Sequence, residues 1–235
     1  MNIAWGITGA GHLLKDSYKV FKELSKKDFN ISTFVSLAGE EVLKMYGLFN
    51  KLHKISNGEY MQEIILEREQ GKSFPKTGRF SLGKYDALIV TPTTSNTVAK
   101  IVHGIADTLI TNAVAQAVKG DVPVYIVPVD IAGTTLSEMP YLINRSSCKN
   151  CDICPPSENC PERAIKQKNK KYQIDLLKCT GCGICLKWCE YGAISGGMVK
   201  LKVRDLDAKN VQILSNLDGI TVLESPEEVY KYIIS

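Results

Sequence analysis

The sequence lacks long apolar runs and carries little net charge. No stretch of 18 consecutive apolar residues occurs anywhere in the 235 residues. The first nine residues meet glycine and polar side chains too soon for a signal peptide. A net charge of +4 is too small to indicate nucleic-acid binding by itself. We therefore expect a cytoplasmic protein that binds neither a membrane nor nucleic acid.

Cysteine, by contrast, is concentrated in one short segment. All eight cysteines lie between Cys148 and Cys189. Because thiols stay reduced in the cytoplasm, we expect metal ligands rather than disulfides. The first run is Cys148-x-x-Cys151-x-x-Cys154-x5-Cys160 and the second is Cys179-x-x-Cys182-x-x-Cys185-x3-Cys189. An Ala-Ile pair follows each run, so the segment contains an internal repeat.

This spacing is typical of a module that holds two [4Fe-4S] clusters. Three thiolates two residues apart can bind three corners of one cluster, while the fourth cysteine of the run binds the other cluster. The implied ligand sets are Cys148, Cys151, Cys154 with Cys189, and Cys179, Cys182, Cys185 with Cys160. Two structural zinc sites are the alternative, although zinc sites need no third cysteine at the same short spacing.

The cysteine segment resembles the bacterial-type ferredoxins, with two departures. Five residues instead of three precede Cys160, and Glu190 stands where a proline is usual. The longer loop should change solvent access or reduction potential at the nearby cluster. A cluster of another type at that site is the alternative.

The remainder of the chain alternates expected strands with expected helices. Strands are expected at residues 3–7, 31–35, 87–90, 122–127 and 220–223, and helices at 13–24, 40–46 and 98–119. This alternation implies parallel βαβ units in an α/β fold. Residues 62–76 are charged and weakly periodic, which favours an exposed helix end and loop. Residues 225–228 are expected to form a capping box with proline at the first helical position.

The order of these segments predicts an inserted module. We expect an α/β domain at residues 1–144 and a ferredoxin-like α+β domain with two [4Fe-4S] clusters at 145–199. A lone strand and helix cannot bury their apolar faces, so residues 200–235 should return to the first domain.

Two polar segments suggest where a phosphate would bind. Gly9-x-Gly11 follows the first strand, but the third glycine of the dinucleotide motif is absent, so this signal is weak. Residues 91–97, Thr-Pro-Thr-Thr-Ser-Asn-Thr, follow another strand at the start of a helix. There, free backbone N–H groups and hydroxyls can hold a phosphate. A capped helix start is the alternative, and it would need only one of these residues.

Residues 7–9, 91–100 and 104–109 resemble the family of homo-oligomeric flavin-containing cysteine decarboxylases and their relatives. The resemblance spans about residues 1–130 and implies a flavodoxin-like (Rossmann-like) parallel sheet with helices on both faces. It also implies FMN at a subunit interface in trimers or multiples of trimers. The residues that would surround FMN, with its phosphate at the helix starts, are Thr8, Gly9, Ala10, Gly11, Ser36, Thr93, Thr94, Ser95 and Thr97. His12 either approaches this phosphate or simply begins a helix.

Two features of the decarboxylases are not evident here. Their histidine before the strand that leads to the Pro-x-x-x-Asn-Thr motif has no counterpart in residues 77–86. Their Pro-x-Met-Asn substrate clasp has none after Pro128, where the chain continues Val-Asp-Ile-Ala. Decarboxylation is therefore disfavoured.

The combination resembles the archaeal branch of this family in which a flavoprotein is joined to a ferredoxin module, the dihydromethanopterin reductases and archaeoflavoproteins. The resemblance implies an FMN and iron-sulfur reductase. Electrons would pass from ferredoxin or another low-potential donor through both clusters to FMN, and on to a dihydropterin such as dihydromethanopterin. A pure electron carrier between ferredoxin-like partners is the alternative. No catalytic side chain can be assigned from the sequence.

Overall fold

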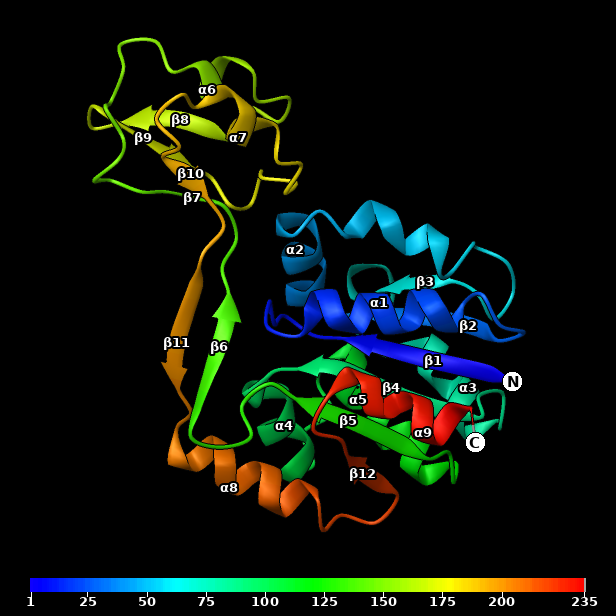
Figure 1. Ribbon diagram of the computed structural model, residues 1–235. Helices are drawn as coiled ribbons and strands as arrows, with labels where there is room; N and C mark the ends of the chain where they lie inside the picture. The colour runs from blue at the N-terminus through cyan, green and yellow to red at the C-terminus, as the bar shows by residue number, and fades with distance from the viewer. Residues whose placement is uncertain (235) are drawn as a thin grey trace.

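A six-stranded parallel sheet forms the centre of the larger domain in the computed structural model, which describes residues 1–234 (Figure 1). Its strand order is β12-β5-β4-β1-β2-β3. The strands are β1 Asn2–Ile7, β2 Asn30–Val35, β3 Ile64–Leu66, β4 Ala87–Thr93, β5 Val124–Pro128 and β12 Ile220–Val222. The chain adds β2 and β3 on one side of β1 and then continues on the other side with β4. The strand order therefore reverses between β1 and β4, which is where open α/β sheets place ligands.

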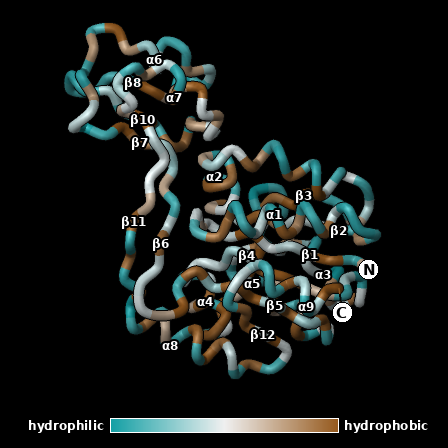
Figure 2. The backbone as a smooth tube through the Cα atoms, in the orientation of Figure 1, coloured by the Kyte–Doolittle hydropathy of each residue, from teal (hydrophilic) through white to brown (hydrophobic). Residues whose placement is uncertain are grey.

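Alternating side chains of the strands build an apolar core on each face of the sheet. In β1, Ile3, Trp5 and Ile7 are fully buried in one core, and Ala4 lies in the other. The first face is covered by α1 Leu14–Leu24, α2 Leu37–Met45, η1 Phe49–Lys54 and α9 Val229–Ile233. The second face is covered by α3 Gly78–Ser81, α4 Ser95–Val102, α5 Leu109–Lys119 and α8 Asp205–Leu214. Figure 2 shows the apolar strands between these layers. The expected α/β fold with helices on both faces is confirmed.

A small module stands apart from the sheet on a two-stranded antiparallel stem (Figure 1). The stem consists of β6 Thr134–Glu138 and β11 Met198–Lys202. The module contains the strand pairs β7 Leu142–Ile143 with β10 Ile194–Ser195 and β8 Ile165–Lys168 with β9 Lys171–Ile174, and the helices α6 Pro155–Glu158 and α7 Ile184–Trp188. Ile165, Tyr172 and Ile194 form its small buried core, against which four cysteines pack.

Four local expectations differ from the structure. Residues 98–119 form two helices, α4 and α5, because Gly104 adopts a left-handed φ of +68° between them. Residues 62–76 contain β3, which pairs with β2, as well as η2 Glu67–Glu69 and η3 Pro75–Thr77. The helix expected from residue 40 begins at Leu37. No side-chain cap forms at Ser225, because the Glu228 carboxylate accepts from the Glu224 N–H instead, and η4 Pro226–Glu228 precedes α9.

Within residues 1–234, no helix combines the length and apolar character needed to cross a membrane.

Candidate flavin and cluster sites

The loop after β1 is locked against the start of α2. A Cβ atom placed on Gly9 would lie 2.6 Å from the Ala38 Cβ, and one on Gly39 would lie 2.7 Å from the Ile7 carbonyl oxygen. Both distances are shorter than any side chain tolerates, so glycine is required at both positions. The Ser36 hydroxyl caps α2 by accepting a hydrogen bond from the Gly39 N–H at 3.0 Å. The glycine turn is thus held in one place by close packing.

Thr8 joins the two strands between which the strand order reverses. Its hydroxyl donates to the Pro92 carbonyl oxygen at 2.7 Å and accepts from the Thr94 N–H at 2.9 Å. The side chain is 2% exposed, so both bonds are shielded from water. Buried hydrogen bonds of this kind fix the loop after β1 relative to the start of α4.

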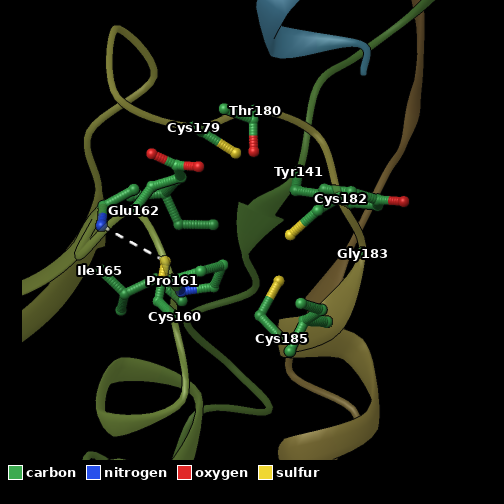
Figure 3. Close-up of a pocket in the computed structure, with 13 residues that line it drawn as sticks. Tyr141, Cys160, Pro161, Glu162, Ile165, Cys179, Thr180, Cys182, Gly183 and Cys185 are labelled. Carbon is green, nitrogen blue, oxygen red and sulfur yellow. Dashed lines mark hydrogen bonds between the residues drawn. The ribbon is translucent and has the colours of Figure 1, made fainter. Parts of the chain in front are cut away.

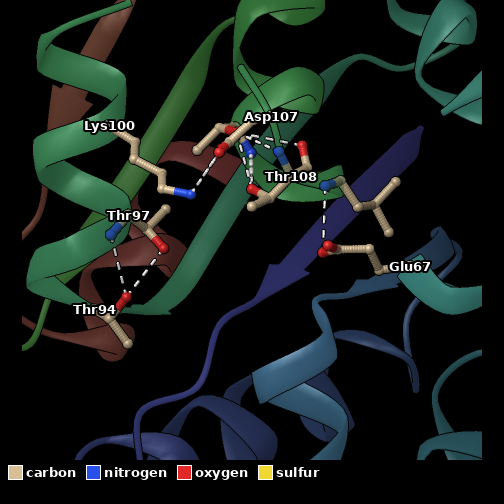
Figure 4. A network of polar contacts seen from close by, with 8 residues as sticks. Glu67, Thr94, Thr97, Lys100, Asp107 and Thr108 are labelled. Carbon is tan, nitrogen blue, oxygen red and sulfur yellow. Dashed lines mark hydrogen bonds and ion pairs between the residues drawn. The ribbon is translucent and has the colours of Figure 1, made fainter. Parts of the chain in front are cut away.

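The start of α4 is capped by its own threonines (Figure 4). The Thr94 hydroxyl accepts from the Thr97 N–H at 3.2 Å, and the two hydroxyls lie 3.0 Å apart. Thr93, which was expected near the cofactor, lies inside β4, fully buried, and its hydroxyl donates to the Val90 carbonyl oxygen. Nearby, Lys100 forms an ion pair of 2.7 Å with Asp107. The helix begins at the edge of the sheet where the strand order reverses, and the first N–H groups of a helix can bind an anion there.

The Glu67 side chain, which follows β3, reaches the start of α5 on the same edge of the sheet (Figure 4). Its carboxylate accepts from the Leu109 N–H at 3.3 Å. Burial raises the pKa of this carboxyl, and the backbone hydrogen bonds partly oppose the rise. The carboxylate pairs the Leu109 N–H, in addition to the capping box that Thr108 and Thr111 form at the start of this helix.

A cleft of about 360 Å³ opens at this edge. It is lined by the glycine turn, the start of α4, the end of β5 and the stem, namely by Gly9, Ala10, Gly11, His12, Thr94, Ser95, Asn96, Val129, Asp130, Thr135, Ser137, Leu201 and Arg204. The structure therefore brings Gly9, Ala10, Gly11, Thr94 and Ser95 of the expected flavin residues to one cleft. The other four expected residues, Thr8, Ser36, Thr93 and Thr97, are not among its lining residues.

The stem forms one wall of the cleft, and the sequence analysis did not predict this contribution. The Nε2 atom of His12 and the hydroxyl of Thr135 lie 2.9 Å apart. Burial lowers the pKa of His12, although Asp130 and other carboxylates oppose this effect, so the ring is neutral at neutral pH. Arg204 is paired with Asp207 at 2.7 Å, and the Ser95 hydroxyl donates to Asp130. Thr135 and Arg204 stand on opposite sides of an inserted segment, and no local motif marks them.

The cysteines line two separate cavities in the module. Cys160 from the first run lines one cavity with Cys179, Cys182 and Cys185 from the second (Figure 3). Cys189 from the second run lines the other cavity with Cys148, Cys151 and Cys154 from the first. We call these the near set and the far set, respectively, because the loop between Cys179 and Cys182 contacts the flavin domain, as described below. Each set contains three cysteines from one run and one from the other.

The internal repeat extends to the hydrogen bonds around the fourth cysteine of each run. The Ala164 N–H donates to the Cys160 sulfur at 3.3 Å, and the Ala193 N–H donates to the Cys189 sulfur at 3.4 Å. Such N–H groups stabilise a thiolate and tune a metal that it binds. The Ala-Ile pair after each run therefore has a role in the geometry of the site.

Burial and crowding disfavour the charged form of the thiols. Burial raises the pKa of Cys185 to about 11, and the neighbouring Cys179, Cys182 and Cys160 add to the rise. Burial likewise raises the pKa of Cys154 in the far set. Bound iron would remove this cost, because a metal deprotonates its thiol ligands outright. The four-sulfur linings fit iron-sulfur clusters, and the glycine turn with its helix start fits a flavin phosphate.

The fold and both sites define an electron-carrying flavoprotein. The model of the family described as Flavoprotein matches residues 1–137. Over 230 residues, the chain is 63% identical to "Dihydromethanopterin reductase (acceptor)" from Methanosarcina mazei, which covers 97% of this chain and 96% of that protein. The chain therefore belongs to the flavoprotein family and, within it, to the family of the dihydromethanopterin reductases.

Two further matches concern the whole fold and the module. The structure of Burkholderia xenovorans DmrB in complex with FMN, described as a cubic protein cage for redox transfer, has a TM-score of 0.63 at 25% identity and covers 98% of this chain and 92% of that one. A segment of 47 residues is 38% identical to an uncharacterized ferredoxin from Methanocaldococcus jannaschii and covers 20% of this chain and 28% of that protein. The resemblance inferred from the sequence motifs is confirmed.

Proposed function

We propose that the protein is an FMN and iron-sulfur reductase that converts a dihydropterin, dihydromethanopterin, to tetrahydromethanopterin. The observation that carries this proposal is the presence, in one chain, of a phosphate-type cleft and two four-cysteine cavities. The relative that is 63% identical over nearly the whole chain bears the name of this activity.

The cofactors would be one FMN and two [4Fe-4S] clusters. FMN would lie against Gly9, Ala10, Gly11, Thr94 and Ser95, which line the cleft. The other four expected residues, Thr8, Ser36, Thr93 and Thr97, would hold these lining segments in place. The near set and the far set would each bind one cluster. When bound, the clusters carry one electron at a time, and FMN collects two and delivers a hydride equivalent.

The residues of the chain would position this chemistry rather than perform it. Reduction of the C=N bond needs a hydride on carbon and a proton on nitrogen, and the two electrons come from the external donor. The hydrogen bonds of Thr8 fix the loop after β1 against α4, and the stem residues Thr135 and Leu201 cover one side of the cleft. This wall would shield one side of the bound flavin from water.

The partners would be ferredoxin or another low-potential donor and further copies of this chain. We propose a homotrimer or a multiple of three in the cytoplasm, since one small domain would leave an edge of FMN exposed. Residues 1–144 would form the flavin domain, 145–199 the cluster domain and 200–235 the returning strand and helix. Scattering from a monomer that retains FMN tightly would contradict the trimer.

The test is an anaerobic assay of the reconstituted protein. We expect one FMN and about eight irons per chain, and reduced protein should convert dihydromethanopterin to tetrahydromethanopterin as FMN is reoxidised. Zinc without acid-labile sulfide would contradict the cluster assignment. The rival function, electron transfer between ferredoxin-like proteins, would appear as oxidation by protein acceptors with no pterin product.

A further inference from the structure

The module contacts the flavin domain through two facing glycines. Gly47 lies two residues after the end of α2 at Met45, and Gly181 lies in the loop between Cys179 and Cys182 of the near set. A Cβ atom on Gly47 would lie 3.0 Å from the Gly181 carbonyl oxygen. One on Gly181 would lie 2.6 Å from the Gly47 nitrogen and would overlap the Met45 carbonyl oxygen. The cysteine loop is therefore in backbone contact with the end of α2, the helix nearest the module in Figure 1.

The internal repeat shows why residue 181 is glycine. The equivalent residue of the far set, between Cys148 and Cys151, is Asn150. Its φ is +55°, close to the +61° of Gly181, so the cysteine loop itself accepts asparagine at this position. The Asn150 side chain donates instead to the Lys170 carbonyl oxygen inside the module. Glycine at 181 is thus required by the contact with α2 rather than by the loop.

Tyr46 continues this contact to the flavin cleft. It lies between Met45 and Gly47 at the end of α2, and its hydroxyl donates to the Glu138 carbonyl oxygen of the stem at 2.5 Å. A Cβ atom on Gly11 would overlap the same hydroxyl, so the phenol lies directly on the glycine turn. Burial raises the pKa of Tyr46, and Glu138 adds to the rise. Tyr46 therefore contacts the loop of the near set through its backbone and a lining residue of the cleft, Gly11, through its side chain.

The far set lacks this contact with the flavin domain, since Asn150, its equivalent of Gly181, is bonded inside the module. The side chains around its cavity include Ile153, Trp188 and Tyr191, which are 73%, 47% and 51% exposed. Its cavity thus opens at a surface that a soluble donor protein can reach.

From these contacts we propose that the two cysteine sets act in a fixed order, an inference that rests on the proposed function. The cluster that the far set would hold receives electrons from the donor, and the cluster that the near set would hold passes them to the flavin across the contact of Gly181 with α2 and Tyr46. Each electron leaves a one-electron donor protein and passes through both sets. Two such passages, with protons from water, reduce the flavin fully, and no cysteine changes its oxidation state.

The first test separates docking from cluster assembly. Gly181→Asn retains the backbone conformation seen at Asn150 but cannot fit against α2. The matched control is Gly192→Asn, at a φ of +57° in the same module with nothing within 4 Å of an added Cβ. We expect both variants to retain iron, sulfide and FMN. In Gly181→Asn, hydrogen exchange at the amides of residues 45–47 should rise, and FMN reduction by reduced ferredoxin should slow by up to about 100-fold. An unchanged rate would overturn the proposed electron route across this contact.

The second test establishes the order of the two sets. Cys182→Ala and Cys151→Ala remove equivalent ligands from the near and the far set, and iron analysis first shows that each variant keeps about four irons. With Cys182→Ala, ferredoxin should still reduce the remaining cluster, seen by electron paramagnetic resonance, while FMN stays oxidised. With Cys151→Ala, ferredoxin should reduce neither cofactor rapidly. The reverse pattern would overturn the order. Conversion of dihydromethanopterin by dithionite-reduced wild-type protein tests the proposed function independently of either result.

Discussion

Replacing Gly9 by alanine should weaken FMN binding, because the added methyl group would separate the turn after β1 from the start of α2. The added Cβ would lie 2.6 Å from the Ala38 Cβ, whereas ordinary contacts begin at 3.4 Å. The turn after β1 and the start of α2 must therefore separate by about 0.8 Å. Overpacking of this kind costs about 1–3 kcal/mol. If FMN binding requires the native turn, the dissociation constant should rise roughly 5- to 150-fold.

The assay is titration of apoprotein with FMN, followed by quenching of flavin fluorescence. Gly78→Ala is the matched control, since this glycine lies in α3 of the same domain with nothing within 4 Å of an added Cβ. The control should bind FMN as tightly as the wild type. Equal affinity of Gly9→Ala and wild type would refute the reasoning, because the glycine turn would then not belong to the flavin site.

Three other substitutions test separate parts of the structure. Cys189→Ala should leave FMN bound and reducible by dithionite, but the reduction of FMN by ferredoxin should slow greatly. An undiminished rate with ferredoxin would show that the far set is not on the electron path to FMN. Hydrogen bonds from Arg79 hold the pKa of Glu63 at about 2, below its usual 4.5. The stability from this ion pair is present above pH 4.5 and is lost as the pH falls toward 2. In Glu63→Gln, the free energy of unfolding should therefore fall by about 1–2 kcal/mol less than in the wild type as the pH drops from 4.5 toward 2, after allowance for solvent screening. The same fall in both proteins would contradict the ion pair. Trp5→Phe leaves the buried Thr91 carbonyl oxygen without its 2.8 Å donor and should cost about 1–3 kcal/mol in urea unfolding, whereas Trp188→Phe should cost little.

The sequence predicted the features whose signals are local. The apolar runs of β1, β4 and β5 are set by burial on both faces of a parallel sheet, so they are visible in a short window. The cysteine repeat is equally local, because three ligands of each set come from one loop.

The features that were missed depend on distant segments. β3 contains three residues inside a charged stretch, and only its pairing with β2 makes it a strand. The stem pairs Thr134 with Lys202, 68 positions apart, so its contribution to the flavin cleft has no local signature. Tyr46 resembled an ordinary helix end in the sequence. Its role depends on Gly11 and Glu138, which only the folded chain brings to it.

The two strands of the stem also have a consequence for how such a protein can be assembled. The chain leaves the flavin domain through β6 and returns beside it through β11, with Glu138 paired with Met198. Everything between these two residues could be replaced by a tight turn without moving an end of any strand in the large sheet. The electron-carrying part is therefore a cassette, which can be gained, exchanged or lost at one point of the chain while the sheet and its glycine turn stay in place.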